Sequence, residues 1–113
     1  MTLREKNEKF RQLCTVMDTL HIRKSNDYGD SFGQMWERYG ITSAMIRLTD
    51  KMNRLYGLTS GKAQMVMDES VRDTLMDLAS YALMTVIELD KDSQNTSVSK
   101  WTVTYDNTEG EHE

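Results

Sequence analysis

Apolar side chains recur every three or four residues in three long stretches of this chain, and that spacing most constrains its fold. Residues three and four apart lie on the same face of an α-helix, so each stretch predicts a helix with one apolar face. The chain has no proline to interrupt such helices. We therefore predict an all-α fold. The apolar faces contain Leu3, Phe10, Leu13, Cys14, Met17 and Leu20; then Met45, Leu48, Met52 and Leu55; and finally Val71, Leu75, Leu78, Ala79, Ala82, Leu83, Val86 and Leu89.

Capping residues and glycines predict where the helices begin and end. Thr2 and Glu5 have the spacing of a capping box, which opens the first helix. Gly40 ends a short second helix, Thr42 or Ser43 caps the third, and Asp68 caps the fourth. The predicted helices cover residues 3 to about 24, 31 to 39, 42 or 43 to about 58, and 68 to about 91, with a loop at 25–30.

The composition changes after the fourth predicted helix. Val98–Tyr105 alternates in polarity and is rich in Val, Thr, Trp and Tyr, which predicts an extended segment. A lone strand is not stable by itself, so this segment must pair with another subunit or lie across the helices. We therefore expect a helical domain at 1–92 and an extended C-terminal segment with an acidic tail at 93–113.

Charge and hydropathy exclude several classes of partner. The formal net charge is −4, which argues against binding to a nucleic acid polymer, because such proteins are usually basic. No apolar run approaches the roughly 20 residues of a membrane span. Met1–Phe10 lacks the apolar core of a signal peptide. We expect a cytoplasmic protein with no membrane partner, in which Cys14 is a buried free thiol.

A chain of 113 residues with several apolar helix faces does not easily cover all of them by itself. Nine methionines add adaptable side chains of the kind found at interfaces. Helical proteins of this size often complete their core by association. The sequence therefore predicts a homo-oligomer, most simply a dimer or tetramer.

Glu69, Asp73 and Asp77 follow one another at four-residue intervals in the fourth predicted helix. Like charges at this spacing destabilise a helix by a few tenths of a kcal/mol per pair. Carboxylates beside an apolar face need a cation or a hydrogen-bond donor to compensate them. This acid ladder therefore suggests a divalent metal or a cluster of basic groups. The alternative is a solvated polar helix face.

The third predicted helix carries a dense charged face made of Arg47, Asp50, Lys51 and Arg54. Arginine forks match pairs of phosphate oxygens, so the cations predict a phosphate site. Asp50 would then complete a metal site with the acid ladder. In the alternative interpretation, the two arginines only neutralise the acids of the fourth helix.

The segment from Lys24 to Gly29 is dense in hydrogen-bonding side chains. Lys24 suits a phosphate, whereas Asn26 and Asp27 suit a sugar or the edge of a base. Gly29 can adopt a positive φ or let a ligand approach the backbone. The alternative is an ordinary turn between helices.

Trp36 and Tyr81 are large aromatic side chains that could stack on a base. Such residues are more often part of a core or an interface. The two histidines, His21 and His112, have no partners at metal-binding spacing.

Three segments together resemble a known family: KSNDYGDSF, RLTDKMNRLYGL and DESVRDTLMDLASYALM. They resemble the nucleotide-modification-associated domain common in phages, over roughly Arg23–Glu88. That domain is related to the all-α nucleoside triphosphate pyrophosphohydrolases typified by MazG. The resemblance implies a MazG-like helical bundle that oligomerises and binds a nucleotide together with Mg²⁺. It also implies attack of metal-activated water on the polyphosphate, which releases pyrophosphate.

The resemblance and the charge pattern together give a set of candidate residues. The metal ligands would be Asp50, Glu69, Asp73 and Asp77, and the catalytic acids Asp50, Asp73 and Asp77. The nucleotide would be held by Lys24, Asn26, Asp27, Tyr28, Arg47, Lys51, Arg54 and Tyr81.

The acid set is incomplete by comparison with MazG-like enzymes, which carry Glu-Glu-x-x-Glu on the first metal-binding helix. Here the segment Ile46–Asp50 keeps at most one acid, and Arg47 replaces a glutamate. The alternative function is a non-catalytic nucleotide-binding oligomer, an anti-defence sponge that sequesters cyclic nucleotides or ADP-ribose derivatives used as immune signals. If the protein is encoded by a phage, its location would be the host cytoplasm. A purely structural helical oligomer is the third alternative.

Overall fold

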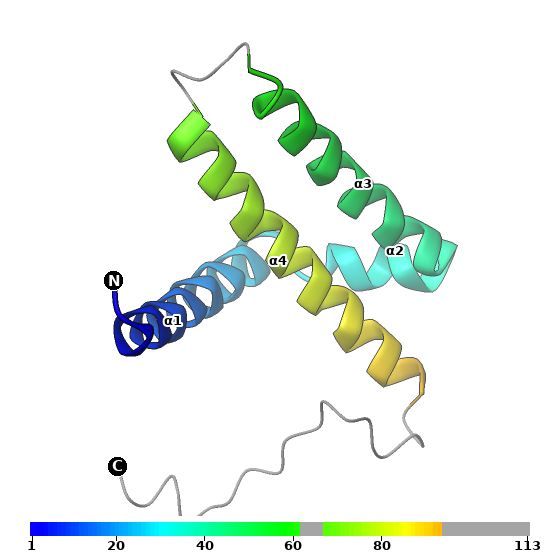
Figure 1. Ribbon diagram of the computed structural model, residues 1–113. Helices are drawn as coiled ribbons and strands as arrows, with labels where there is room; N and C mark the ends of the chain where they lie inside the picture. The colour runs from blue at the N-terminus through cyan, green and yellow to red at the C-terminus, as the bar shows by residue number, and fades with distance from the viewer. Residues whose placement is uncertain (62–66, 94–113) are drawn as a thin grey trace, which may run out of the picture.

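In the computed structural model, which describes residues 1–61 and 67–93, the chain forms four α-helices and those residues contain no strand (Figure 1). The helices are α1 (Leu3–Tyr28), α2 (Ser31–Tyr39), α3 (Ile41–Leu58) and α4 (Met67–Asp92). The predicted all-α fold is confirmed for this part of the chain. The predicted extended segment Val98–Tyr105 lies outside it. No helix within the described ranges is long and apolar enough to cross a membrane.

Helix α1 begins where the capping box predicts and ends later than predicted. The Glu5 N–H donates to Thr2 Oγ1 at 3.1 Å, and the Thr2 N–H donates to Glu5 Oε1 at 2.7 Å. The helix then continues through Ser25 to Tyr28, so the prediction of a loop at 25–30 was wrong for most of its length. Helix propensity is a weak signal, and the polar residues here follow a helix that is already formed. Gly29 stops it with φ at 67°, a conformation that suits glycine.

Two residues set the turns on either side of α2. Asp30 caps its first turn, because its Oδ1 accepts a hydrogen bond from the Gly33 N–H at 3.1 Å. Gly40 ends it with φ at 69°. Helix α3 begins directly after Gly40, so the predicted cap at Thr42 or Ser43 was wrong. The hydroxyl of Ser43 instead donates to the Gly40 carbonyl at 2.8 Å, inside the first turn of α3.

Helices α3 and α4 lie side by side in opposite directions and form the centre of the molecule (Figure 1). Ala44 of α3 is completely buried, and Thr74 of α4 is 2% exposed. The Arg54 Nε donates to Thr74 Oγ1 at 3.2 Å and so links the two helices. Thr74 satisfies its own hydroxyl by donating to the Ser70 carbonyl at 2.7 Å. The polar group buried between these helices is therefore paired.

Helix α2 is fixed against the last turn of α4. Trp36 is buried, and its indole Nε1 donates to Asp92 Oδ2 at 2.7 Å. Lys91 forms ion pairs with Glu37 of α2 and with Glu88 of α4. Of the two roles weighed for Trp36, its burial supports the structural one.

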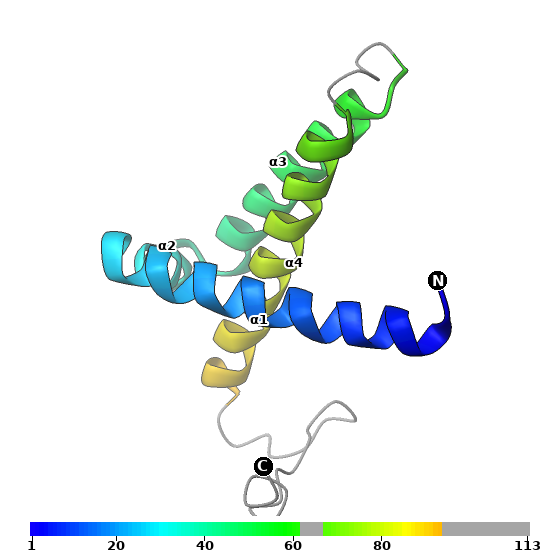
Figure 2. The ribbon, with the colours of Figure 1, turned by 90° about the vertical axis from the view of Figure 1, so that its left-hand side faces the viewer.

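Helix α1 crosses α4 and extends beyond it toward the N-terminus (Figure 2). It has no buried residue, and Leu3 and Phe10 are 73% and 71% exposed. Cys14 is also exposed, so the prediction of a buried thiol was wrong. The apolar spacing of α1 correctly predicted a helix. No other helix of the described chain covers the apolar side chains in its N-terminal half.

Candidate functional site

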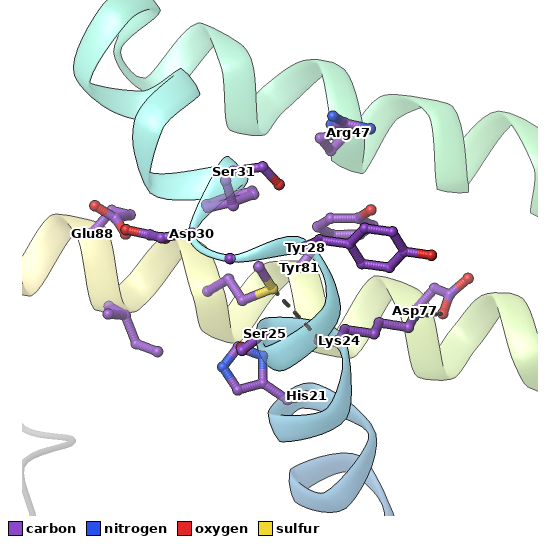
Figure 3. A pocket seen from close by; sticks show the side chains of 15 residues that line it. His21, Lys24, Ser25, Tyr28, Asp30, Ser31, Arg47, Asp77, Tyr81 and Glu88 are labelled. Carbon is purple, nitrogen blue, oxygen red and sulfur yellow. Dashed lines mark hydrogen bonds and ion pairs between the residues drawn. The ribbon is translucent and has the colours of Figure 1, made fainter.

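A cavity of about 500 Å³ lies where the C-terminal end of α1 meets α4 (Figure 3). The turn between α1 and α2 forms one wall, and α3 reaches it through Arg47. Its size falls in the usual range for small-molecule sites, roughly 300–1,000 Å³. The side chains and backbone around it belong to His21, Lys24, Ser25, Tyr28, Gly29, Asp30, Ser31, Phe32, Arg47, Asp77, Ser80, Tyr81, Met84, Ile87 and Glu88.

One face of α4 supplies the floor of this cavity. Its lining residues lie three or four apart, which places them on the same side of a helix. Between Asp77 and Glu88 the helix advances about 16 Å, because each residue adds about 1.5 Å. Steps of four and three residues lead from Asp77 through Tyr81 and Met84 to Glu88. The face that carries the predicted acid ladder therefore continues into the cavity.

Positive charge gathers at the Asp77 end of the cavity. The Asp77 carboxylate pairs with Lys51 Nζ at 3.2 Å and with Lys24 Nζ at 3.9 Å. Arg47 also lines this end, and no carboxylate of the described residues lies within 4 Å of its guanidinium. Two lysines thus pair with one carboxylate, and Arg47 adds a third cation to the lining, which leaves an excess of positive charge. The alternative in which Arg47 neutralises Asp77 does not hold here, because the two lysines fill that role.

Aromatic rings stand next to these cations. Tyr81 lies against Phe32, with ring centroids 6.0 Å apart and planes inclined by 31°. The Lys51 ammonium is 5.9 Å from the centre of the Tyr81 ring, at the outer limit of a cation–π contact. Tyr28 is 73% exposed, and Figure 3 shows it near Tyr81 on the side that carries Arg47 and Lys24. The site therefore offers flat apolar surface beside its positive charge.

Carboxylates stand at the opposite end of the cavity. Glu88 is 8% exposed, and its Oε1 lies 2.8 Å from Lys91 Nζ. Close contacts with the carboxylates of Glu37 and Glu88 raise the pKa of Lys91 above its ordinary value. Asp30 reaches the same end from the turn before α2 (Figure 3). The cavity thus has a cationic end and an acidic end.

Four of the predicted nucleotide-binding residues line the cavity: Lys24, Tyr28, Arg47 and Tyr81. Lys51 lies at its edge through its contacts with Asp77 and Tyr81.

Three other predicted nucleotide-binding residues do not reach the cavity. Asn26 and Asp27 are exposed in the last turn of α1 and do not line it. Arg54 lies seven residues beyond Arg47 and is engaged with Thr74.

Of the three predicted acids whose side chains are described, one lines the cavity. Asp77 lines the cavity, whereas Asp50 and Asp73 are exposed and lie outside its lining. Glu69 is part of α4, but its side chain lies outside the described part of the structure. Among the side chains that are described, no three His, Cys, Asp or Glu residues are close enough to share a metal ion. Because Asp77 is also held by two lysines, the described acids Asp50, Asp73 and Asp77 do not form a Mg²⁺ site by themselves.

Sequence reasoning missed the acidic end of the cavity. Glu88 was passed over because it lies near the end of an apolar helix, eleven residues beyond Asp77. The signal in the sequence is helical spacing: steps of four, three and four residues from Asp77 lead to Glu88 on the same face of the helix. Asp30 was assigned only to a loop, and its position follows from the turn that Gly29 imposes.

A family model matches the chain. The family described as nucleotide modification associated domain 1 matches residues 24–89, which is more than half of the chain. The matched segment contains every residue that lines the cavity except His21. Neither a curated protein nor a solved structure matches the chain.

Proposed function

The chain belongs to the family of nucleotide modification associated domain 1, and on that premise we propose that its cavity binds a phosphate-bearing nucleotide. One observation carries the proposal. A chain of net charge −4 collects Lys24, Arg47 and Lys51 around the Asp77 end of a single cavity. An acidic protein that concentrates cations in this way creates a local anion site against its own net charge.

The proposed binding mode follows the order of groups along the cavity. Arg47, which has no carboxylate partner among the described residues, offers its guanidinium to the phosphates. Lys24 and Lys51 both pair with Asp77 in the free protein. Because one carboxylate neutralises only one of the two positive charges, the lysines also attract the phosphates of the ligand. Tyr28 and Tyr81 lie beside them and contact the sugar or the base.

Hydrolysis of the nucleotide is the second candidate function. It rests on the placement of Asp77, the one predicted catalytic acid in the cavity, and on the proposed MazG-like relationship of the family. In that relationship Mg²⁺ would activate water for release of pyrophosphate. The described acids do not fit such an ion, so binding without turnover is the better-supported function. If the protein releases pyrophosphate from nucleoside triphosphates in the presence of Mg²⁺, hydrolysis becomes the better-supported function.

We also propose that the protein functions as a homo-oligomer in which a second copy covers the N-terminal half of α1. The support is the exposure of large apolar side chains there, together with the small number of buried ones in the described chain. Exposed apolar area of this extent is uncommon on monomers and is typical of interfaces.

Titration calorimetry tests the nucleotide site directly. The ligands are nucleoside mono-, di- and triphosphates, cyclic dinucleotides and ADP-ribose derivatives, each with Mg²⁺ and with EDTA. We expect at least one to bind and its affinity to fall as salt rises. No binding of any of them would remove the nucleotide site.

A pair of arginine variants locates the phosphates. Arg47→Ala should weaken binding at least tenfold, because it removes a charge-assisted hydrogen bond to phosphate. Arg54→Ala is the matched control, since Arg54 is on the same helix but outside the cavity. Its affinity should stay within twofold of the unmodified protein. Equal losses in both variants would place the phosphates elsewhere.

A further inference from the structure

Building on the proposed function, we infer that Glu88 makes the cavity selective for nucleotides whose base carries an exocyclic amino group. The inference starts from the polarity of the cavity. Cations stand at the Asp77 end, and carboxylates from Glu88 and Asp30 stand at the other (Figure 3). A ligand that satisfies both ends carries negative charge on one side and hydrogen-bond donors on the other.

The order of groups in a nucleotide decides which part reaches Glu88. Phosphates at Arg47 and Lys24 place the sugar next and the base last. Along α4 the residues that follow Tyr81 are Met84 and Ile87, which offer apolar surface to the plane of a base. Glu88 stands beyond them, about 16 Å along the helix from Asp77. The carboxylate therefore meets the edge of the base rather than the sugar.

The chemistry of Glu88 determines what that edge must present. An ionised carboxylate only accepts hydrogen bonds. Lys91 Nζ lies 2.8 Å from Oε1 in an ion pair, yet this buried oxygen accepts no hydrogen bond of good geometry from the described residues. Glu88 is 8% exposed, so water has little access to compensate it. An amino group on the base supplies the missing donor, in the way that carboxylates accept from the amino group of cytosine.

The alternative is that Glu88 only anchors Lys91 and α2. A purely structural role would not discriminate between bases. A matched pair of ligands therefore separates the structural role of Glu88 from a role in base selectivity. Adenosine and purine riboside differ only in the 6-amino group. Each is titrated as the 5′-monophosphate and the 5′-triphosphate into the unmodified protein. We expect the adenosine compounds to bind at least tenfold more tightly, the usual minimum for a buried hydrogen bond to a charged group.

Three outcomes would overturn some part of this inference. Equal binding of adenosine and purine riboside compounds removes the selectivity and leaves the nucleotide site intact. No binding by any of the four also contradicts the inference, because the adenosine compounds carry the amino group; the nucleotide site itself stands or falls with the wider series of ligands in the titration above. A preference that persists unchanged in Glu88→Met removes Glu88 as its source. We expect that variant, which keeps the length of the side chain but offers only a weak acceptor, to lose most of the preference while still binding purine riboside phosphates.

Discussion

Single polar contacts join helices that are distant in sequence. Trp36 and Asp92 are separated by 56 residues, and their hydrogen bond holds the short helix α2 against the last turn of α4. This contact also shapes the acidic end of the cavity, because Glu88 and Lys91 belong to the same stretch of α4. Asp92 is therefore a structural residue, and its loss would loosen the contact between α2 and α4 beside the acidic end of the cavity.

We expect Asp92→Ala to lower the free energy of unfolding by about 1–3 kcal/mol. The substitution removes a hydrogen bond to a charged acceptor and leaves the buried indole N–H without its partner. Urea denaturation followed by circular dichroism measures the change. Asp90→Ala is the control, because Asp90 is exposed and has no contact of this kind. It should change stability by less than about 0.5 kcal/mol, and an equal effect of both variants would contradict the role given to Asp92.

Ala44 gives a second prediction at this scale. It is completely buried on α3, the helix that packs on both α2 and α4. Ala44→Leu should destabilise the fold by about 1–3 kcal/mol, because the added atoms force neighbouring helices apart. The same denaturation experiment applies, with Ala82→Leu on the exposed side of α4 as the matched control. A neutral result at Ala44 would mean that space is available at this contact.

The sequence predicted one end of the cavity better than the other. Lys24, Arg47, Asp77 and Tyr81 were chosen because charged and aromatic residues at helical spacing are visible without coordinates. The site also depends on how α1 crosses α4, which no periodicity within one helix reveals. For that reason Arg54 looked equivalent to Arg47 in sequence, although only one of them reaches the cavity.

At the scale of elements, the helix ends were set by backbone conformation more than by side-chain preference. Polar residues after Lys24 predicted a loop, yet α1 continues until Gly29, the first residue there with a positive φ. The extra turn carries Tyr28 to the mouth of the cavity. Apolar periodicity predicted the existence of each helix, whereas the exact termini depended on two glycines.

The capping box of α1 predicts a dependence on pH. Hydrogen bonds from Thr2 lower the pKa of Glu5 below its ordinary value of 4.5. A lowered pKa in the folded state means that the cap is fully effective above about pH 4.5 and is lost as the pH falls through the lowered value. The protection factors of the amides in the first turn of α1, taken relative to intrinsic exchange at each pH, should therefore fall in acid.

Two variants separate the cap from general acid effects. Thr2→Ala should lower the protection factors of the first-turn amides several-fold at neutral pH and should remove most of their pH dependence. Glu8→Gln is the control, because Glu8 pairs with Arg11 on the surface of α1 and does not cap it. A first turn that shows the same exchange in the Thr2 variant and the unmodified protein would mean that the cap has no effect in solution.

At the scale of the whole molecule, the described chain resembles part of a larger core. Helices α3 and α4 bury only a few residues between them, and α1 leaves its N-terminal half uncovered (Figure 2). The cavity lies at the junction where α1 leaves α4, so anything that fixes α1 also fixes Lys24 and Tyr28. Association and ligand binding are therefore expected to support each other.

The proposed association through α1 gives the last prediction. Light scattering should find a particle of at least twice 13.1 kDa at micromolar concentration. Phe10→Glu should shift it toward the monomer, because it places a charge in the middle of the exposed apolar face. Gln12→Glu introduces the same group about 160° away around α1, where a helix turns by about 100° per residue, and should leave the mass unchanged. If the Phe10 variant keeps both its helical circular dichroism and the mass of the unmodified protein, the second copy does not dock on this face.

A dissociated and still helical Phe10 variant should also bind the nucleotide more weakly, since α1 would then hold Lys24 less firmly at the cavity.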